Sequence, residues 1–480
     1  MNLSRLKHLF IVCLFAASIF PACGQSVQPA PTLVIRIDDL GAFHSVNEAC
    51  IRTYQSGIAR SVEVMPVAAW YPEAIRLLKE NPGLDVGLHL VITSEWENVK
   101  WRPLTHCPSL TDENGYFYPM MGPNPAYPGQ SIMENKWDLK EVEQEFRAQI
   151  EMALKSIPQL SHLTGHMLST GFTKEVNEMV VRLAKEYNLP SIDRMDSPEN
   201  YQFTYIGYDG PSRTGTEKEE SFIRSLNKLE AGKRYLFLDH PALDNEEMKT
   251  VFHIGYENVT LDRQGVTDLL TSPRVKQVIK DKGIRLISIN QLTKGLPRAN
   301  APKKLERAMD KYLKAMQKNN QDLHSIMIVQ HGNILAEEWT CGQDTESASY
   351  IWIDSTTIPK TNKEKLTDYL YPRLFRPLGI VNVKCQAAPD NINRKGWRLF
   401  FKTEDLAKMG QFFLQQGKWN GRQLLSEEWT AKVSAYCTDG ANGQYVLVIP
   451  EKDAVIAVTT RTGSGQAEVD LIRKHLLPAL

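Results

Sequence analysis

The stretch Leu33-Val34-Ile35-Arg36-Ile37-Asp38-Asp39-Leu40-Gly41 decides the fold, because an apolar run ends there in two adjacent carboxylates and a glycine. The run is rich in β-branched residues and predicts a buried strand, so Asp38 and Asp39 should lie at its carboxyl end. Barrels and doubly wound sheets place their chemistry at that end. Two neighbouring acids repel each other, and a bound cation or a shared proton relieves the repulsion. The stretch therefore indicates a metal site, with a turn that uses Asp-Asp only for capping as the alternative.

The residues after Gly41 alternate between the patterns of helices and strands, which is typical of an α/β fold with a mostly parallel sheet. Apolar runs predict strands at residues 61–65, 85–90, 235–238 and 284–289, and another near His162. Periodic apolar positions predict helices at residues 47–54, 72–79, 139–155, 173–187 and 272–282. Because parallel strands bring their carboxyl ends to one face, residues far apart in sequence should meet there.

The size and charge of the chain limit the number of domains and the kinds of partner that we expect. At 480 residues it is longer than one typical domain, and length alone predicts about two or three. It carries 56 basic and 56 acidic residues, and neither sign is gathered into a long run. Nothing in this balance indicates nucleic acid or an anionic membrane as a partner.

Residues 1–25 have the features of a signal peptide, so we expect export to the periplasm or cell envelope. Arg5 and Lys7 give a charged start, residues 9–20 are apolar, and residues 21–25 form a small-residue cleavage region. Ala22-Cys23 also resembles a bacterial lipoprotein box, which would attach the protein to a membrane through a lipid on Cys23. No later stretch reaches the ~20 apolar residues that a membrane helix needs.

Three histidines fall at or just past predicted strand ends, as the two aspartates do. They are His89 in Gly-Leu-His-Leu, His166 in Thr-Gly-His-Met and His240 in Leu-Asp-His-Pro. One such histidine is more often a core or capping residue than a ligand. Several on separate strands of one sheet, together with paired aspartates, favour a site at their common face. Two imidazoles and a carboxylate with open positions suit Zn²⁺ or a related divalent ion.

Several motifs resemble one family when their order and spacing are taken together. The Asp-Asp-Leu-Gly turn is followed by Val46-Asn47-Glu48-Ala49, Gly87-Leu88-His89-Leu90, His162 with Gly165-His166, and His240-Pro241. This series resembles the YdjC-like (ChbG/HpnK) carbohydrate deacetylases from about residue 33 to residue 296. The resemblance implies an irregular (β/α) barrel of the polysaccharide deacetylase type, which we place at residues 30–297.

The resemblance also implies roles for single residues. Asp39, His89 and His166 match the metal ligands, Asp38 matches the general base, and His240 matches a further active-site histidine. The cofactor would be Zn²⁺ or Mg²⁺, and the substrate would be an N-acetylated sugar or oligosaccharide whose acetyl group is removed by a metal-bound water. Thr164-Gly165 departs from the family, whose members usually carry Asp-Ser before this histidine. A glycan-binding pseudoenzyme without turnover is therefore the alternative.

An aromatic segment interrupts the alternation at residues 95–135, where proline and glycine are also frequent. Beside a barrel mouth it could supply stacking faces for a sugar ring, and a packed surface loop is the alternative. Trp96 and Trp101 of this segment, together with Arg194, are candidates for the lining of the cleft.

A second, smaller α+β unit is expected at residues 305–480, after a linker at residues 298–304. Its patterns predict a helix at 305–317, a hairpin of 326–329 with 334–339, helices at 363–375, 403–416 and 426–434, strands at 445–449 and 454–459, and a closing helix from Glu468.

Motifs in this second unit resemble the serine β-lactamase and penicillin-binding-protein superfamily. They lie at residues 369–380, 396–399, 403–407, 419–421 and 426–429. The segment of the superfamily's sequence that should lie between Trp339 and Lys363 is almost wholly missing. No Ser-x-x-Lys motif, which supplies the nucleophile of that superfamily, occurs after residue 300. The stretch from Ser355 lacks the lysine that would activate a serine, and no Lys or His stands before Gly443 in the third motif. We expect a truncated β-lactamase-like remnant without serine hydrolase activity.

Overall fold

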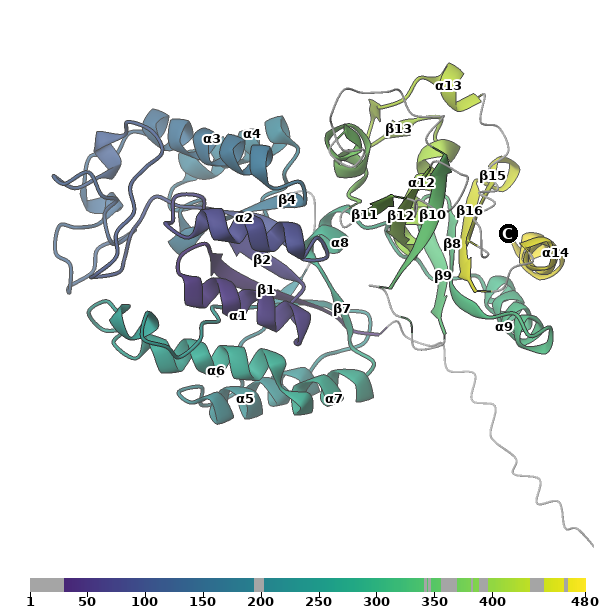
Figure 1. Ribbon diagram of the computed structural model, residues 1–480, viewed down its shortest axis with the longest axis horizontal. Coiled ribbons are helices and arrows are strands. Elements are labelled where there is room, and N and C mark those ends of the chain that lie inside the picture. The colour runs from purple at the N-terminus through teal and green to yellow at the C-terminus, as the bar shows by residue number, and fades with distance from the viewer. Residues whose placement is uncertain are drawn as a thin grey trace, which may run out of the picture.

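The computed structural model describes residues 30–193, 203–340, 343, 347–354, 369–380, 383–387, 396–431, 444–461 and 465–480 (Figure 1). Several sequence predictions fall outside these residues: the signal peptide with Cys23, Arg194, the stretch from Ser355, most of the helix at 363–375, the end of the helix at 426–434 and the third motif before Gly443. Within the described ranges, no helix is both long enough and apolar enough to cross a membrane.

The first unit is built on a 7-stranded sheet whose pairings are all parallel. The strand β1 (Thr32–Leu40) lies at its centre, in the order β4-β3-β2-β1-β6-β5, and β7 runs beside the first part of β1. The remaining strands are β2 (Ser61–Val64), β3 (Asp85–Leu90), β4 (Leu160–Gly165), β5 (Thr204–Tyr205), β6 (Arg234–Asp239) and β7 (Arg285–Ile287). The sheet curls into an irregular half-barrel, which confirms the predicted α/β class.

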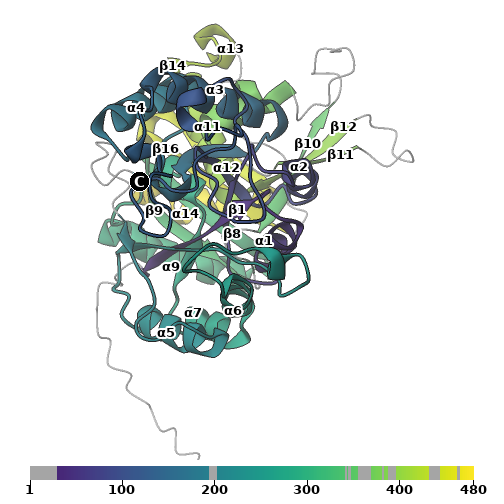
Figure 2. The ribbon, with the colours of Figure 1, turned by 90° about the vertical axis from the view of Figure 1, so that its left-hand side faces the viewer.

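Helices cover the outer face of this sheet. In Figure 1, α3 (Leu139–Ser156) and α4 (Lys174–Tyr187) lie above β1, while α5 (Gly215–Asn227), α6 (Val259–Thr271) and α7 (Pro273–Asp281) lie below it. Figure 2 shows the same two groups on opposite sides of the strands, with α1 (His44–Gln55) and α2 (Tyr71–Glu80) beside them.

The alternation of side chains along β1 separates two environments. Leu33, Ile35 and Ile37 point outward and are fully buried in the main hydrophobic core. Val34 points inward and belongs to a small apolar cluster with Leu236 and Ile287 at the floor of the half-barrel. Above this floor, the inward positions of β1 to β4 are polar and buried: Arg36, Asp38, Glu63, His89, His162 and Thr164. A buried polar interior needs internal partners, and it marks where the chemistry can lie.

The aromatic segment is a packed loop. It contains the short helices η1 (Pro108–Leu110) and η2 (Ile132–Glu134). Trp96 and Trp101 are only 2% and 4% exposed, and the indole Nε1 of Trp101 donates to the Thr93 carbonyl at 2.7 Å. Of the two interpretations left open by the sequence, the structure supports packing for these two rings.

Predicted and observed elements agree closely around the first strands, and β3 has the predicted bounds. The helices α5, α6 and α8 (Ile289–Lys294) were not predicted from periodicity. The strand predicted at 284–289 is shorter, because Ser288 begins α8 with a capping box that includes Gln291.

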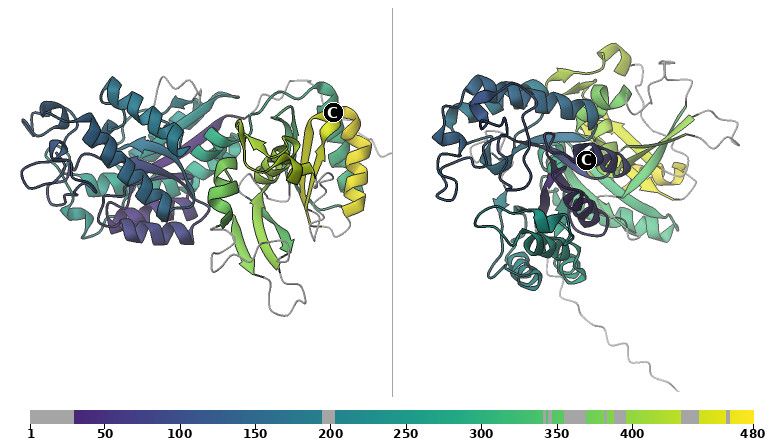
Figure 3. Two further views of the ribbon diagram at one scale, coloured as in Figure 1. Left: turned by 90° about the horizontal axis from the view of Figure 1, so that it is seen from above. Right: turned by 60° about the vertical axis from the view of Figure 1, so that its left-hand side comes forward.

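The second unit has a sheet covered on both faces. The antiparallel order β15-β16-β8-β9 joins β15 (Gln444–Ile449), β16 (Ala454–Thr460), β8 (Leu323–Gln330) and β9 (Asn333–Trp339). One face packs on α12 (Thr403–Leu414), and the other packs on α9 (Lys303–Lys318) and α14 (Gly465–His475). Figure 3 shows α14 at the end of the molecule that is farthest from the half-barrel.

A smaller sheet, β10-β12-β11, completes this unit with β10 (Ala348–Asp354), β12 (Gly396–Lys402) and β11 (Lys384–Ala387). The other described elements are the π-helical turn η6 (Tyr371–Phe375), α11 (Arg376–Leu378), the pair β13 (Lys418–Trp419) and β14 (Arg422–Gln423), α13 (Glu427–Ala431), and the 3₁₀ turns η7 (Pro450–Lys452) and η8 (Leu477–Ala479). The expected α+β content is therefore present.

Candidate metal centre

An irregularity at the end of β1 brings Asp39 into the mouth of the half-barrel. Asp38 lies on the inward face, so regular alternation would turn Asp39 outward. Instead the register with β2 shifts before Leu40, and Asp39 has a φ of 73°. This left-handed conformation is uncommon for a residue with a side chain. Asn47 supports the turn by accepting the N–H of Gly41 at 2.7 Å. Both carboxylates consequently face one site.

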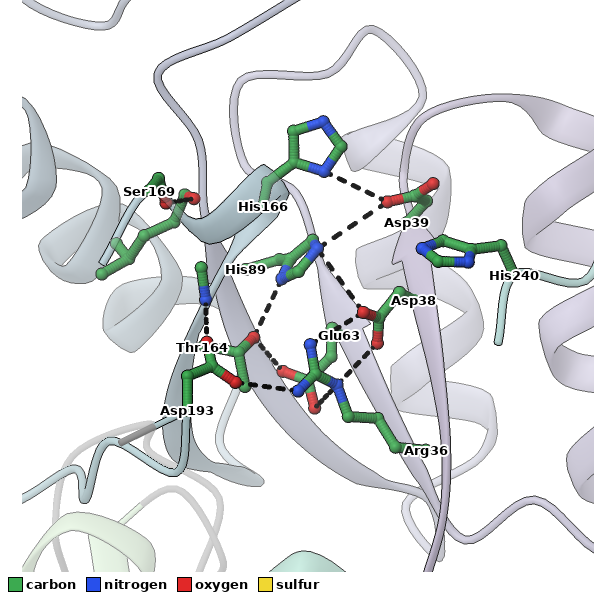
Figure 4. A network of polar contacts seen from close by, with 12 residues as sticks. Arg36, Asp38, Asp39, Glu63, His89, Thr164, His166, Ser169, Asp193 and His240 are labelled. Carbon is green, nitrogen blue, oxygen red and sulfur yellow. Dashed lines mark hydrogen bonds and ion pairs between the residues drawn. The ribbon is translucent and has the colours of Figure 1, made fainter. Parts of the chain in front are cut away.

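Asp39, His89 and His166 converge at this mouth from the ends of β1, β3 and β4 (Figure 4). Each offers one ligand atom, and these atoms lie within 4.8 Å of one another. Oδ1 of Asp39 is 3.8 Å from Nε2 of His89 and 3.5 Å from Nδ1 of His166. Atoms bound to one cation at about 2.0–2.2 Å have similar separations. The structure thus brings together the three residues that the sequence predicted as ligands.

Hydrogen bonds fix the other nitrogen of each imidazole. Nδ1 of His89 lies 2.9 Å from Oγ1 of Thr164, and Nε2 of His166 lies 3.0 Å from Oε2 of Glu95. Oxygen acceptors at these positions favour an N–H there, so the nitrogen that faces Asp39 is the one available to bind a cation. This orientation is the one that a metal-binding histidine requires.

Burial and neighbouring charges together set the pKa values of the three candidate ligands. Burial disfavours the ionised form of Asp39, but Arg263, His240 and His166 outweigh it and hold the pKa of Asp39 well below its usual range. Burial and the neighbouring His166 and Arg36 charges lower the pKa of His89, so this imidazole is neutral. For His166, burial is outweighed by Glu95 and Asp39, which raise its pKa to about 10. A cation bound here must therefore displace a proton from His166.

The residues present fit a divalent cation. Oδ1 of Asp39 is buried and has no hydrogen-bond partner among the described residues, although Oδ2 accepts from Arg263 at 2.9 Å. A buried carboxylate oxygen without a partner costs free energy. A cation between Oδ1 and the two imidazoles would satisfy it, and one carboxylate with two imidazoles is a donor set that catalytic Zn²⁺ and related ions accept.

Asp38 lies next to the candidate ligands but is held by a different partner. Both of its oxygens accept from the guanidinium of Arg36 at 2.7 Å. Its Oδ2 is 3.7 Å from Nε2 of His89. The bidentate pair fixes the carboxylate at the edge of the cation site. The position predicted for a general base is therefore beside the three ligands.

His240 follows β6 and lies beside the two aspartates in Figure 4. Its side chain is 36% exposed, and Nδ1 is 3.6 Å from Oδ1 of Asp239. Burial lowers the pKa of His240, but the carboxylates of Asp39 and Asp239 outweigh it and raise the pKa. His240 is thus a partly exposed histidine that can hold a proton at the rim of the site.

Five residues of the site were not identified as such from the sequence: Glu63, Glu95, Thr164, Asp193 and Arg263. Asp193 accepts from Arg36 at 3.0 Å and from the backbone N–H of Gly165 at 2.5 Å. An acid inside the apolar strand Ser61-Val62-Glu63-Val64, and an arginine two residues before Asp38, were the available signals for a polar interior. The partners of each group come from distant segments, which the strand pattern does not reveal.

Comparisons with known proteins place relatives over the first unit. A family model described as YdjC-like protein matches residues 32–281. A carbohydrate deacetylase of Enterococcus faecalis is 29% identical over 276 residues, which are 54% of this chain and 97% of that protein. A carbohydrate deacetylase of Thermus thermophilus is 30% identical over 231 residues, 45% of this chain and 79% of that protein. A chitooligosaccharide deacetylase of Yersinia pestis is 29% identical over 271 residues, 53% of this chain and 96% of that protein.

Proposed function

Since the chain belongs to the YdjC-like protein family, we propose that it removes acetyl groups from N-acetylated sugars or oligosaccharides with the help of a divalent cation. The observation that carries this proposal is the buried Oδ1 of Asp39, which has no hydrogen-bond partner within the described ranges and lies between the imidazoles of His89 and His166. The relatives named carbohydrate or chitooligosaccharide deacetylase support the choice of substrate class. Two imidazole ligands suit Zn²⁺, and Mg²⁺ is the second candidate.

A cation held by Asp39, His89 and His166 would activate a water molecule and polarise the acetyl carbonyl. Asp38 accepts the proton of the attacking water at Oδ2, and Arg36 keeps this carboxylate in place. His240 donates a proton from Nε2 to the departing amine, because its Nδ1 faces Asp239. The amide and water are converted to acetate and an amino sugar.

The experiment that tests this proposal separates binding from turnover. Asp38→Asn should leave the affinity for Zn²⁺ nearly unchanged, since Asp38 is not a ligand, and should lower kcat for diacetylchitobiose by about 10²–10⁴-fold. Asp310→Asn, at an exposed position of α9, is the matched control. If the wild type binds the sugar but releases no acetate, the chain is a glycan-binding pseudoenzyme instead.

For the second unit and the location of the protein we retain the sequence predictions as proposals. The unit at residues 305–480 is a non-catalytic, truncated β-lactamase-like remnant, supported by the absence of Ser-x-x-Lys after residue 300. The features of residues 1–25 support an exported protein of the periplasm or cell envelope.

A further inference from the structure

The candidate metal ligand His89 is connected to a buried carboxylate by a chain of two successive hydrogen bonds. Oγ1 of Thr164 lies 2.9 Å from Nδ1 of His89 and donates to Oε2 of Glu63 at 2.7 Å. The Leu88 carbonyl is a weaker alternative acceptor for this hydroxyl, at 3.4 Å. A hydroxyl has one proton, so when it donates to Glu63 it must accept the N–H of His89. Glu63 and Thr164 are both fully buried, which keeps water from replacing either bond.

We propose that Glu63 is a positioning residue of the metal centre, which acts on His89 through the hydroxyl of Thr164. The negative charge of Glu63 orients the hydroxyl, and the hydroxyl fixes the tautomer of His89 that leaves Nε2 free for the cation. Carboxylates that hold a metal-binding histidine in this way usually contact it directly. In this chain one hydroxyl is inserted between them. The inference rests on the proposed function, because it assumes that His89 binds a cation.

The surroundings of Glu63 hold its carboxylate in this position. Oε1 accepts from Nε2 of His162 at 2.8 Å, and Nε of Arg36 lies 3.6 Å away. Gly87 of the neighbouring strand leaves room for this pair, because a Cβ at that position would collide with the carboxylate of Glu63 and the ring of His162. A glycine within a strand weakens the strand, so its presence is consistent with a close approach of this kind.

A purely structural ion pair between Glu63 and His162 would explain the same burial, and three variants distinguish the two roles. Thr164→Val removes the hydroxyl and leaves the Glu63–His162 pair intact. Glu63→Gln removes the charge at the end of the chain. Glu63→Gln combined with Thr164→Asp brings a carboxylate directly to Nδ1 of His89, while the amide at position 63 can still donate to residue 164 and accept from His162.

The test is titration of the metal-free full-length protein with Co²⁺, followed by visible absorption. Thr164→Val and Glu63→Gln should each bind Co²⁺ about 10–100-fold more weakly than the wild type. The double variant should regain most of the lost affinity, which a purely structural role of Glu63 does not predict. Thr53→Val is the matched control, since Thr53 is a buried threonine in α1 whose hydroxyl donates to the Cys50 carbonyl.

The outcomes separate this inference from the proposed function. If the wild type and Thr164→Val bind Co²⁺ equally well, or if the double variant stays as weak as Glu63→Gln while its circular dichroism is unchanged, the role of Glu63 is refuted and the metal site stands. If the wild type binds none of Co²⁺, Zn²⁺ and Mg²⁺, the proposed function fails and this inference fails with it.

Discussion

At the scale of single residues, the interior of the half-barrel is stabilised by matching buried charges. Arg36 contacts Asp38 at 2.7 Å and Asp193 at 3.0 Å, and His162 is enclosed by Glu63 and Ser161. Ser161 lies 2.6 Å from Nδ1 of His162 and donates to Oδ1 of Asp85 at 2.6 Å. Since the serine proton goes to Asp85, the serine oxygen accepts the N–H of His162. Both nitrogens of His162 therefore donate, which is the pattern of a charged imidazole.

This arrangement predicts a pH-dependent contribution of His162 to stability. Burial lowers the pKa of His162, but Glu63 outweighs it and raises the pKa above 6.5. A raised pKa gives stability that is fully present below the unfolded value and is lost as the pH rises through the folded value. The difference in free energy of unfolding between wild type and His162→Gln should therefore be larger at about pH 6 than at about pH 9. Urea denaturation of metal-free protein at both pH values measures this, and an equal difference would contradict it.

The candidate ligands could be predicted at this scale, whereas their supporting partners could not. Asp39, His89 and His166 each stand at the end of a strand, so the pattern of strands and the family resemblance were sufficient to group them. Glu95 lies at the start of a loop whose path the sequence does not specify. The inward turn of Asp39 depends on a register shift with β2, which strand patterns do not encode.

At the scale of elements, the loop between β3 and α3 is held from both ends. Glu145, buried in α3, accepts from the backbone N–H groups of Leu104 and Thr105 at 3.0 and 2.9 Å. Trp101 is anchored to Thr93 at the other side. A loop with these internal partners is a rigid wall of the half-barrel and differs from a mobile lid.

Replacing Trp101 by phenylalanine tests this role of the loop. The variant loses the indole hydrogen bond and part of the buried ring, so it should lower the free energy of unfolding by about 2 kcal/mol. KM for diacetylchitobiose should change little, because the ring is only 4% exposed. Trp70→Phe, at a 39% exposed tryptophan, should have little effect on stability. Thermal unfolding and steady-state kinetics provide the two readings, and a raised KM at unchanged stability would indicate a sugar contact instead.

The elements that were not predicted, or were predicted with other bounds, each have their own physical reason. The helix α5 has a capping box of Thr214 and Glu217, which was a readable signal at residue level. The helix α6 buries an arginine, Arg263, on its inner face, so its apolar stripe is interrupted. At β7, a short apolar stretch of β-branched residues fits both a strand and the start of a helix, and Ser288 decides where the helix begins.

At the scale of the whole molecule, charged and polar contacts join the second unit to the linker and to the first unit. Arg298 donates to both oxygens of Glu337 at 2.8 and 2.9 Å and to Glu404 at 3.0 Å. The side chain of Asn290 in α8 donates to the Gly379 carbonyl at 2.8 Å. Burial opposes the charge on Glu404, but Arg298 and Lys408 outweigh it and lower the pKa of Glu404.

Arg298→Met should destabilise the attachment of the second unit. The change leaves the buried carboxylate of Glu404 without its guanidinium, and the loss of one partner from a buried ion pair costs about 3–5 kcal/mol. We expect about 2–3 kcal/mol, because the side chain of Arg298 is 29% exposed and Leu296 still donates to Glu404. Limited proteolysis around residues 295–302 and thermal unfolding measure the effect. Arg307→Met on the exposed face of α9 is the control, and equal behaviour of the two variants would contradict the prediction.

The division into two units followed from composition and motif order, but the contacts between them did not. Residues 298–304 were predicted as a linker because two prolines and an alanine-lysine run occur between Leu296 and Lys304. In the structure, Arg298 forms a β-bridge with Ile334, and α9 begins at Lys303. A contact of this kind depends on where the second sheet lies, which no local pattern in the linker specifies.

The most direct test of the central claim is acetate release from diacetylchitobiose and longer chitooligosaccharides by the protein. The reaction is followed without addition, with a chelator, and with the chelator followed by excess Zn²⁺ or Mg²⁺. A metal-dependent deacetylase predicts release that the chelator abolishes, that the added ion restores, and that is absent in His166→Ala. Release that persists in the chelator and in His166→Ala, or no release under any condition, would contradict the account.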